Sequence, residues 1–184
     1  MNKIAVIFSG VGYTTDRPLL YYAGRLAVAH GYEVVSVDFS GIRWSKEELK
    51  DHRRFAEILD ECLKKTELKL GGVKMGSMEE IVFISKSIGT VVAAWFAKEK
   101  GIRAKQIYFS PLVLLEEYAQ EGGIAFYGDS DPLADAKEME RICAEKKIKA
   151  YKTAGGNHSL ETGDTEENLK NLTGIMKSVK EYIR

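Results

Sequence analysis

The sequence has little of several features that would point to particular classes of protein. It carries no excess charge, because 27 basic residues balance 27 acidic ones. Nucleic-acid binding through a general basic surface is therefore not expected. No apolar run approaches the roughly 20 residues of a membrane-spanning helix, so we expect no membrane span. The start, MNKIAVIFSG, has too short an apolar run for a signal peptide, which favours a cytoplasmic protein.

Cysteine, proline and histidine are also scarce. The two cysteines, Cys62 and Cys143, lie far apart without the spacing of metal ligands, so we expect buried thiols and no metal site. Three prolines, with no repeat or low-complexity tract, are consistent with a compact fold. The length of 184 residues suits a single domain spanning 1–184. The three histidines leave few candidates for acid–base chemistry.

What the sequence does contain is an alternation of short apolar runs with amphipathic segments. Runs rich in Val, Ile, Phe and Tyr predict strands at 3–9, 33–39, 80–85, 106–109, 124–127 and 149–153. Nearly continuous apolar strands are typical of parallel sheets buried on both faces. Helical segments separate them, and one opens with Ser45 and Glu48 at capping-box spacing. The alternation predicts an α/β fold with a parallel sheet between two layers of helices.

Polar loops follow four of the predicted strands. In a sheet of this kind, ligands bind beyond the carboxyl ends of the strands. We therefore expect any chemistry to lie in these loops, which read SGVGYTTDRP, SKSIG, GDSDP and GGNHS in chain order.

Ser87 is the candidate nucleophile, because it lies at the tip of SKSIG between an apolar strand and an apolar helix. A strand that turns directly into a helix needs small residues two before and two after the tip, and Ser85 and Gly89 meet that need. This is the nucleophile-elbow pattern G-x-S-x-G, with Ser85 in place of the first glycine. The N-terminus of the next helix favours negative charge at the site. Ser87 could alternatively only cap that helix.

A serine nucleophile needs a base, and His158 is the candidate. His30 precedes a glycine at a helix end, and His52 lies in a charged helix. Only His158 follows a predicted strand, after both Ser87 and the candidate acids in chain order. A surface histidine with no role is the alternative interpretation.

The base must be oriented by a carboxylate, for which Asp129 and Asp131 are the candidates. Asp129 directly follows Gly128, where its side chain can accept from backbone N–H groups two residues on. Asp131 lies further round the turn, and Pro132 restricts its backbone to an extended conformation. We therefore favour Asp131 as the acid and assign Asp129 to the turn.

Two backbone N–H groups are needed to stabilise an oxyanion. One belongs to Ile88, directly after the candidate nucleophile. The other is expected from the glycine-containing loop after the first strand, with Val11 as the first candidate and Gly12 or Tyr13 as alternatives. A plain glycine turn would explain the same loop.

The order Ser87, Asp131, His158, each after a predicted strand, resembles the α/β-hydrolase family over nearly the whole chain. The resemblance implies a three-layer sandwich whose six-stranded parallel sheet has the order 2-1-3-4-5-6 and lacks the family's first two strands. It also favours Asp131, because the family's acid commonly lies three residues after the strand-ending glycine. Where the family usually has His-Gly-x-Gly after the first strand here, this sequence has Ser-Gly-Val-Gly.

The resemblance further implies a small serine hydrolase, dienelactone-hydrolase-like or carboxylesterase-like. Only 14 residues, SPLVLLEEYAQEGG, follow the fourth strand, which is too short for the family's lid. The expected substrates are small acyl esters, with thioesters and amides as alternatives, and no cofactor is implied. Arg17 and Arg43 could bind a substrate carboxylate or lie solvated on the surface, and the sequence does not indicate an oligomeric state. Four residues are candidates for an acyl pocket, unless they belong to the core: Tyr13, Leu112, Leu114 and Leu115.

Two other classes of function fit part of the pattern. A flavodoxin-like module also has a parallel sheet, and its first loop holds a flavin phosphate with Ser and Thr, as SGVGYTT could. A catalytically silent hydrolase fold could serve as a binding module. The flavodoxin-like alternative leaves the elbow and His158 without roles, and an intact set of Ser87, Asp131 and His158 argues against a silent fold.

Overall fold

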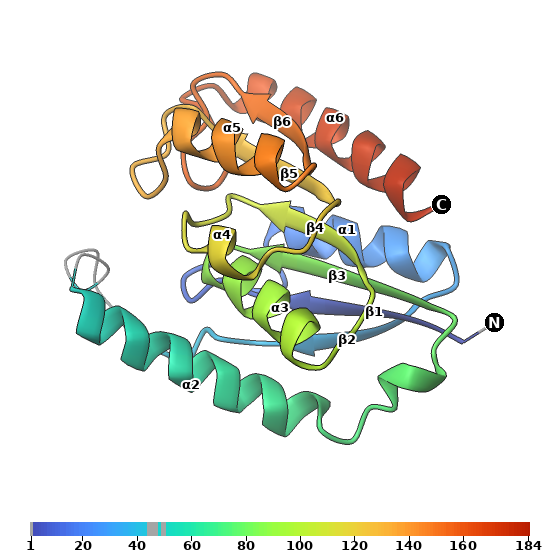
Figure 1. The fold of residues 1–184 in the computed structure, drawn as a ribbon. Coiled ribbons are helices and arrows are strands. Elements are labelled where there is room, and N and C mark those ends of the chain that lie inside the picture. The colour runs from blue at the N-terminus through green and yellow to red at the C-terminus, as the bar shows by residue number, and fades with distance from the viewer. Residues whose placement is uncertain (1, 44–47, 49–50) are drawn as a thin grey trace.

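The computed structural model describes residues 2–43, 48 and 51–184, and its centre is a six-stranded parallel sheet (Figure 1). The strand order is β2-β1-β3-β4-β5-β6, as predicted, with all neighbours parallel. The strands are β1 (Lys3–Phe8), β2 (Glu33–Val37), β3 (Glu80–Lys86), β4 (Lys105–Phe109), β5 (Ile124–Gly128) and β6 (Lys149–Thr153).

Helices cover both faces of the sheet (Figure 1). They are α1 (Pro18–Ala29), α2 (His52–Leu70), α3 (Ile88–Glu99), α4 (Leu115–Tyr118), α5 (Ala136–Glu145) and α6 (Thr165–Ile183), with a 3₁₀ helix, η2 (Met75–Ser77), before β3. α1 and α6 pack together on one face, and α2 and α3 lie on the other. The predicted three-layer arrangement is confirmed.

Side chains of the central strands alternate between two hydrophobic cores. In β1, Val6 and Phe8 belong to the core beneath α2 and α3, whereas Ala5 and Ile7 face α1 and α6. Successive side chains of a strand point to opposite faces of its sheet, so a strand covered on both sides must be apolar throughout. This explains the nearly unbroken apolar runs in the sequence.

Five of the six strands differ from their predicted ranges by one or two residues at one end. β2 ends at Val37 and not at residue 39, because the backbone N–H of Phe39 donates to the Ser9 hydroxyl at 2.8 Å instead of to a strand. The predicted cap Ser45 lies outside the described residues. α2 begins at His52. The Asp51 carboxylate caps it by accepting from the backbone N–H groups of Arg53 and Arg54.

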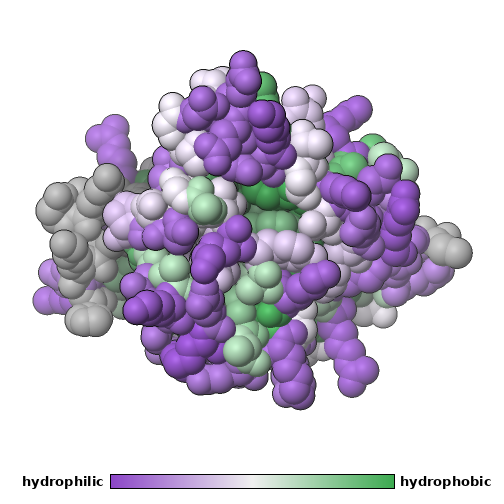
Figure 2. Space-filling view, turned by 90° about the horizontal axis from the view of Figure 1, so that it is seen from above, coloured by the Kyte–Doolittle hydropathy of each residue, from purple (hydrophilic) through white to green (hydrophobic). Residues whose placement is uncertain are grey.

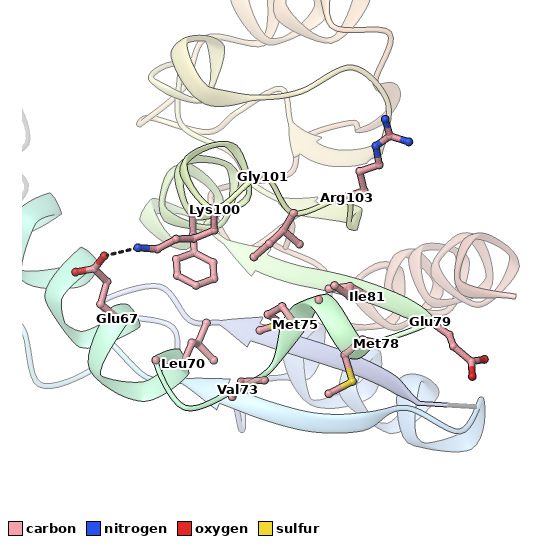
Figure 3. A pocket seen from close by; sticks show the side chains of 14 residues that line it. Glu67, Leu70, Val73, Met75, Met78, Glu79, Ile81, Lys100, Gly101 and Arg103 are labelled. Atoms are coloured by element: carbon pink, nitrogen blue, oxygen red, sulfur yellow. Dashed lines mark hydrogen bonds and ion pairs between the residues drawn. The ribbon is translucent and has the colours of Figure 1, made fainter.

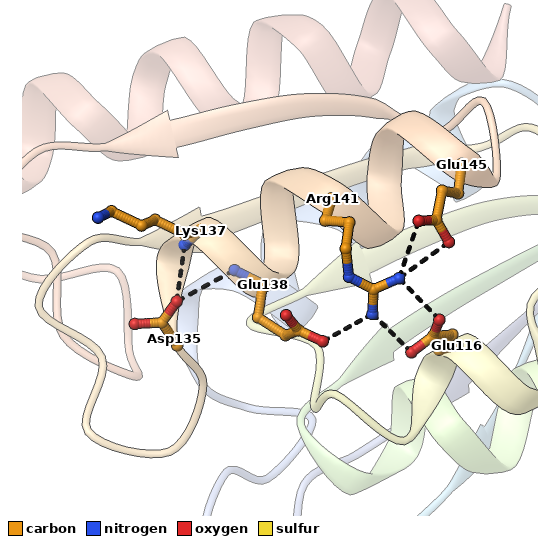
Figure 4. Close-up of polar contacts among 6 residues, drawn as sticks. All are labelled: Glu116, Asp135, Lys137, Glu138, Arg141 and Glu145. Atoms are coloured by element: carbon orange, nitrogen blue, oxygen red, sulfur yellow. Dashed lines mark hydrogen bonds and ion pairs between the residues drawn. The ribbon is translucent and has the colours of Figure 1, made fainter.

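α4 and α5 are joined by an arginine that bridges three carboxylates (Figure 4). Arg141 of α5 contacts Glu116 of α4 at 2.8 Å, together with Glu138 and Glu145 of its own helix at 2.6 and 2.9 Å. Asp135 caps the start of α5 by accepting from two backbone N–H groups. These contacts fix the helix that follows the predicted acid loop.

The β6 side of the molecule, seen from above in Figure 2, is mainly hydrophilic with hydrophobic residues visible between charged ones. β6 is an edge strand with exposed Lys149 and Lys152, and such charges discourage pairing with another chain. Cys62 and Cys143 are both buried and unpaired, as expected. Within the part of the chain that the structure describes, no helix has the length and hydrophobicity to cross a membrane.

Candidate active site

Ser87 stands between β3 and α3 in a backbone conformation that is unusual for serine. Its φ is 55° and its ψ is −125°, and a non-glycine residue with positive φ is uncommon and often marks a functional site. Neighbouring backbone holds it there. Its N–H donates to the Phe109 carbonyl at 3.0 Å, and its carbonyl accepts from the N–H and the hydroxyl of Thr90.

The small residues around Ser87 explain how the turn is possible. A Cβ on Gly89 would lie 2.4 Å from the Ser9 carbonyl oxygen and 2.6 Å from that of Phe8, so only glycine fits where α3 crosses β1. Ser85 is fully buried, and its hydroxyl donates to the Ile107 carbonyl at 3.0 Å. Both positions behave as the elbow pattern predicts.

A hydrogen-bond chain joins Ser87, His158 and Asp131 from the ends of three strands. His158 Nε2 lies 2.8 Å from Ser87 Oγ, and His158 Nδ1 lies 2.7 Å from Asp131 Oδ2. An ionised carboxylate can only accept, so Nδ1 carries the proton and Nε2 is free to accept from the serine. The structure therefore brings together the three residues that the sequence singled out for catalysis.

Burial sets the electrostatics of this chain. The Asp131 side chain is 1% exposed and that of His158 is 22% exposed. Burial lowers the pKa of His158 below its ordinary value, although the hydrogen bond to Asp131 opposes this shift. His158 is consequently a neutral imidazole at pH 7, which is the form that can take a proton.

The hydrogen bonds of Asp129 and Asp131 differ from the prediction. Asp131 itself makes the local turn contact, because its Oδ1 accepts from the Leu133 N–H at 2.9 Å. Asp129 accepts at 2.7 Å from the N–H of Gly155, which lies in the loop after β6. That loop can approach because Gly128 has no side chain, and a Cβ there would lie 1.9 Å from the carbonyl oxygen of Gly156. The local turn bond assigned to Asp129 was therefore wrong.

The loop that carries His158 is held by its own side chains. The Asn157 side-chain oxygen accepts from the N–H groups of Ser159 and Glu161, at 2.7 and 3.2 Å. Leu160 has φ 62° with its side chain buried, a strained conformation for leucine. Interlocking bonds and a buried anchor fix the backbone on both sides of His158.

Lys86 is the residue that sequence reasoning missed. It ends β3 one residue later than predicted, directly before Ser87, and its side chain is fully buried. Its Nζ donates to the carbonyl oxygen of His158 at 2.7 Å and lies 5.1 Å from the centre of the Tyr13 ring. Burial lowers its pKa to about 7, while the nearby Asp131 charge opposes the shift. The sequence contained a hint, because a lysine that directly follows a buried apolar strand must either reach solvent or find a buried partner.

A cleft of about 370 Å³ opens beside Ser87 and His158. The loop after β1 forms one wall through Gly10, Val11 and Gly12, and Tyr13 continues that wall. The opposite side is formed by Pro132 and Leu133, Asn157 and Ser159. The candidate oxyanion residue Val11 is thus beside the serine, and Ile88 begins α3, where the first N–H groups of a helix have no partner in that helix.

Three of the predicted pocket residues lie elsewhere. Leu112 and Leu114 pack in the core around α3, and Leu115 packs in a core cluster formed with β4 and α5. None of the three lines the cleft, and of the four candidates only Tyr13 does. Arg17 is exposed, with its guanidinium carbon 6.0 Å from the Tyr13 ring centre, and Arg43 is exposed. Neither lines the cleft.

A larger hollow, of about 640 Å³, lies at the opposite end of the sheet (Figure 3). It is bounded by the end of α2, the segment before β3 and the end of α3, and its lining includes Leu70, Met75 and Phe96. Its rim carries an exposed ion pair between Lys100 and Glu67 at 3.0 Å. Among the described residues no cluster of His, Cys, Asp and Glu could hold a metal ion, here or at the cleft.

Comparison with protein-family models gives no match, and comparison with curated protein sequences gives none. Solved structures do match. Est1E from Butyrivibrio proteoclasticus has a TM-score of 0.71 at 13% identity, over 99% of this chain and 87% of that one. An α/β serine hydrolase homologue from Coxiella burnetii has a TM-score of 0.70 at 14% identity, over 100% and 87%.

A third similar structure is described as an α/β serine hydrolase without a lid, from Xanthomonas campestris. Its TM-score is 0.61 at 14% identity, over 100% of this chain and 83% of that one. In the present structure only the short helix α4 separates β4 from β5. The sheet order, its direction and these neighbours show that this chain has the α/β-hydrolase fold, and one of the neighbours is described as lacking a lid.

Proposed function

We propose that this protein is a serine hydrolase that cleaves small acyl esters through a covalent acyl-enzyme. Ser87 is the nucleophile, His158 the general base and Asp131 the residue that orients it. The observation that carries the proposal is the continuous hydrogen-bond chain from Asp131 through His158 to Ser87. Its members come from three loops at the carboxyl ends of strands, and Ser87 and His158 line one cleft.

The first half of the reaction acylates the serine. Ser87 Oγ attacks the ester carbonyl carbon while its proton passes to His158 Nε2. The carbonyl oxygen becomes an oxyanion, and the N–H groups of Ile88 and Val11 donate to it. The C–O bond to the alcohol then breaks, and the alcohol leaves with the proton from His158.

The second half releases the acid. A water gives its proton to His158 Nε2 and attacks the acyl carbon, and the serine regains its proton as the acyl–oxygen bond breaks. Asp131 keeps the Nδ1 proton in place and stabilises the imidazolium in both halves. Thioesters and amides could follow the same steps, and no step requires a metal or an organic cofactor.

Lys86 acts in this scheme as a positioning residue. Its Nζ holds the backbone carbonyl of His158 at 2.7 Å, so it links the residue before the nucleophile to the loop of the base. Its position also lowers the pKa of His158 by charge repulsion, which favours the neutral base. Lys86 also lines the cleft, but its Nζ donates to the backbone of His158 and not to the imidazole or to the Ser87 hydroxyl.

The experiment is a panel of chromogenic esters assayed with purified protein. We expect the wild-type protein to hydrolyse short esters and the Ser87→Ala variant to be inactive. Ser159→Ala is the matched control, because Ser159 lines the same cleft, whereas the imidazole of His158 contacts the hydroxyl of Ser87. Equal activity in wild type and Ser87→Ala would exclude the mechanism. A yellow, inactive protein would favour the flavin-binding alternative.

A further inference from the structure

A second hollow, of about 340 Å³, adjoins the cleft at Ser87 and shares Tyr13 and Ser159 with it. It lies between the beginning of α1, the beginning of α6 and the loop that carries His158. Its apolar lining includes Pro18, Leu19, Leu160, Leu169, Leu172 and Ile175, and the remaining lining residues are Tyr13, Ser159, Glu161, Thr165 and Asn168. Each of the two hollows has a volume at the lower end of the range for small-molecule pockets, roughly 300–1,000 Å³.

Leu169 is the most telling residue of this hollow. Its side chain is 61% exposed, whereas most large apolar side chains of the described chain are buried. A single exposed leucine is unremarkable on a surface, but Leu169 stands on the wall of a hollow whose floor is already apolar. Leu160 and Ile175 form part of that floor and are 3% and 7% exposed.

The walls of the hollow are held in place. Asn168 of α6 accepts from the Thr162 N–H at 2.6 Å and from its hydroxyl at 3.0 Å, which ties α6 to the His158 loop. The Tyr13 hydroxyl accepts from the Leu19 N–H at 3.1 Å, so the tyrosine between the two hollows is also anchored. Burial raises the pKa of Tyr13 to about 12, and it remains a neutral phenol.

The charge of the lining narrows the kind of ligand. Among the described residues that line this hollow, Glu161 is the only one besides Tyr13 with an ionisable side chain. The Glu161 carboxylate would repel an anionic ligand. A cationic ligand would find this one carboxylate but would have to bury its charge against apolar side chains. The hollow suits a neutral hydrocarbon.

We propose that the second hollow is a substrate subsite that receives a neutral apolar arm of the ester, an alkyl chain or an aryl group, which passes Tyr13 from the carbonyl at Ser87. The inference rests on the proposed esterase function and names its substrate class. It assigns Leu169 and Leu172 to selectivity and leaves the bond-breaking steps to Ser87, His158 and Asp131.

The test compares the selectivity of Leu169→Asp with that of the wild type. Nitrophenyl acetate and octanoate vary the acyl arm, and methyl and octyl esters of one short acid vary the alcohol arm. In one of the two series we expect the long-to-short ratio of kcat/KM to fall about tenfold in the variant, as for a lost apolar contact in a specificity pocket. Leu68→Asp is the matched control, since Leu68 is an 89% exposed leucine on α2, and its ratio should equal that of the wild type. Unchanged ratios in both series for Leu169→Asp would overturn the proposal.

A binding measurement separates this inference from the proposed function. Methyl NMR spectra of the Ser87→Ala protein are recorded as 1-octanol is added. We expect the signals of Leu160, Leu169 and Leu172 to shift together and that of Leu68 to stay. The shifts require no turnover, so they support the subsite even if no ester in the panel is cleaved. Absence of shifts at these leucines would overturn the subsite even if Ser87 proves to be a nucleophile.

Discussion

The two ends of the sheet carry hollows of opposite character. The larger one, at the amino end of β3, has an apolar floor and an ion pair whose side chains are about half exposed. Such a surface pair contributes little, typically ~0–1 kcal/mol. The cleft at the carboxyl end is lined by a buried lysine and by a serine with positive φ, and a buried aspartate contacts its histidine. Size alone would have selected the wrong end.

The difference shows what to look for in a fold of this kind. Strained backbone and buried charge both cost stability, so they persist only where surrounding contacts hold them. Here Ser87, Lys86 and Asp131 lie within one cluster at one end of the sheet. We interpret this concentration as the mark of a functional site.

Replacing His158, at the carboxyl end of the sheet, should have the largest effect on ester turnover. We expect His158→Ala to lower ester turnover by on the order of 10⁶, the effect of losing a triad histidine in a serine protease. His30→Ala is the control, because His30 Nδ1 contacts the Leu26 carbonyl at the end of α1, far from the cleft in the fold. Steady-state rates on folded variants measure both. If His158→Ala and His30→Ala lost similar amounts of turnover, the catalytic site would not be specific to the carboxyl end of the sheet.

Asp131→Asn should lower turnover by on the order of 10⁴, because an amide no longer selects the right histidine tautomer. The fold should persist, since an asparagine oxygen can still accept from the Leu133 N–H. Asp129→Ala loses the bond to Gly155 instead, so we expect mainly a stability loss of about 1 kcal/mol. Turnover and thermal midpoints of both variants decide the matter. If Asp129→Ala were the inactive one, the two assignments would have to be exchanged.

Lys86→Met should lower turnover by on the order of 10², since His158 loses the contact that fixes its backbone. Lys86→Arg should restore part of the rate if a donor is what matters. If Lys86 had only a structural role, Lys86→Met would lower both turnover and stability. We expect Lys86→Met to lower turnover and to raise stability.

The gain in stability from Lys86→Met should be larger at low pH than at high pH. The folded pKa of Lys86 is about 7, below the ordinary value of about 10.4 in the unfolded chain. Below pH 7 both states are charged, and the full cost of burial is present. Above it only the unfolded state stays protonated, so the cost declines until about pH 10. Lys86→Met should therefore raise the free energy of unfolding by up to about 4 kcal/mol at pH 6, with a smaller gain at pH 9. Denaturant titrations at both pH values measure this, and a gain independent of pH would contradict it.

The smallest effect is a shift in the acid limb of the pH–rate profile. The pKa of His158 is lowered by burial, so the neutral base is present below the ordinary histidine value of about 6.5. We expect kcat/KM to decline only below pH 6.5 as the imidazole is protonated. Asp131→Asn removes a group that opposes this shift, so the residual activity should decline at still lower pH. A limb above pH 6.5 in the wild type would contradict the assignment.

Local signals in the sequence were sufficient for the strands and for the candidate residues of the hydrogen-bond chain, whereas the order of the sheet followed from the resemblance to the α/β-hydrolase family. Apolar runs predict strands, and SKSIG requires a tight turn whatever surrounds it. The packing of Leu112, Leu114 and Leu115 in the core was not predictable in the same way, since it depends on contacts with α3, β4 and α5. Lys86 and the bond from Asp129 to Gly155 depend on contacts across 72 and 26 residues. The local sequence shows that Lys86 follows an apolar strand, but it does not show which distant group either residue contacts.

The most direct measurement of the central claim is the attachment site of a fluorophosphonate, a reagent that reacts with activated serines. Wild-type protein is labelled, digested and mapped by peptide mass, with the heat-unfolded protein as the control for non-specific reaction. The account predicts a single adduct on Ser87, lost in His158→Ala and retained in Ser159→Ala. An adduct on Ser85, Ser159 or any other residue, or none on folded protein, would contradict it.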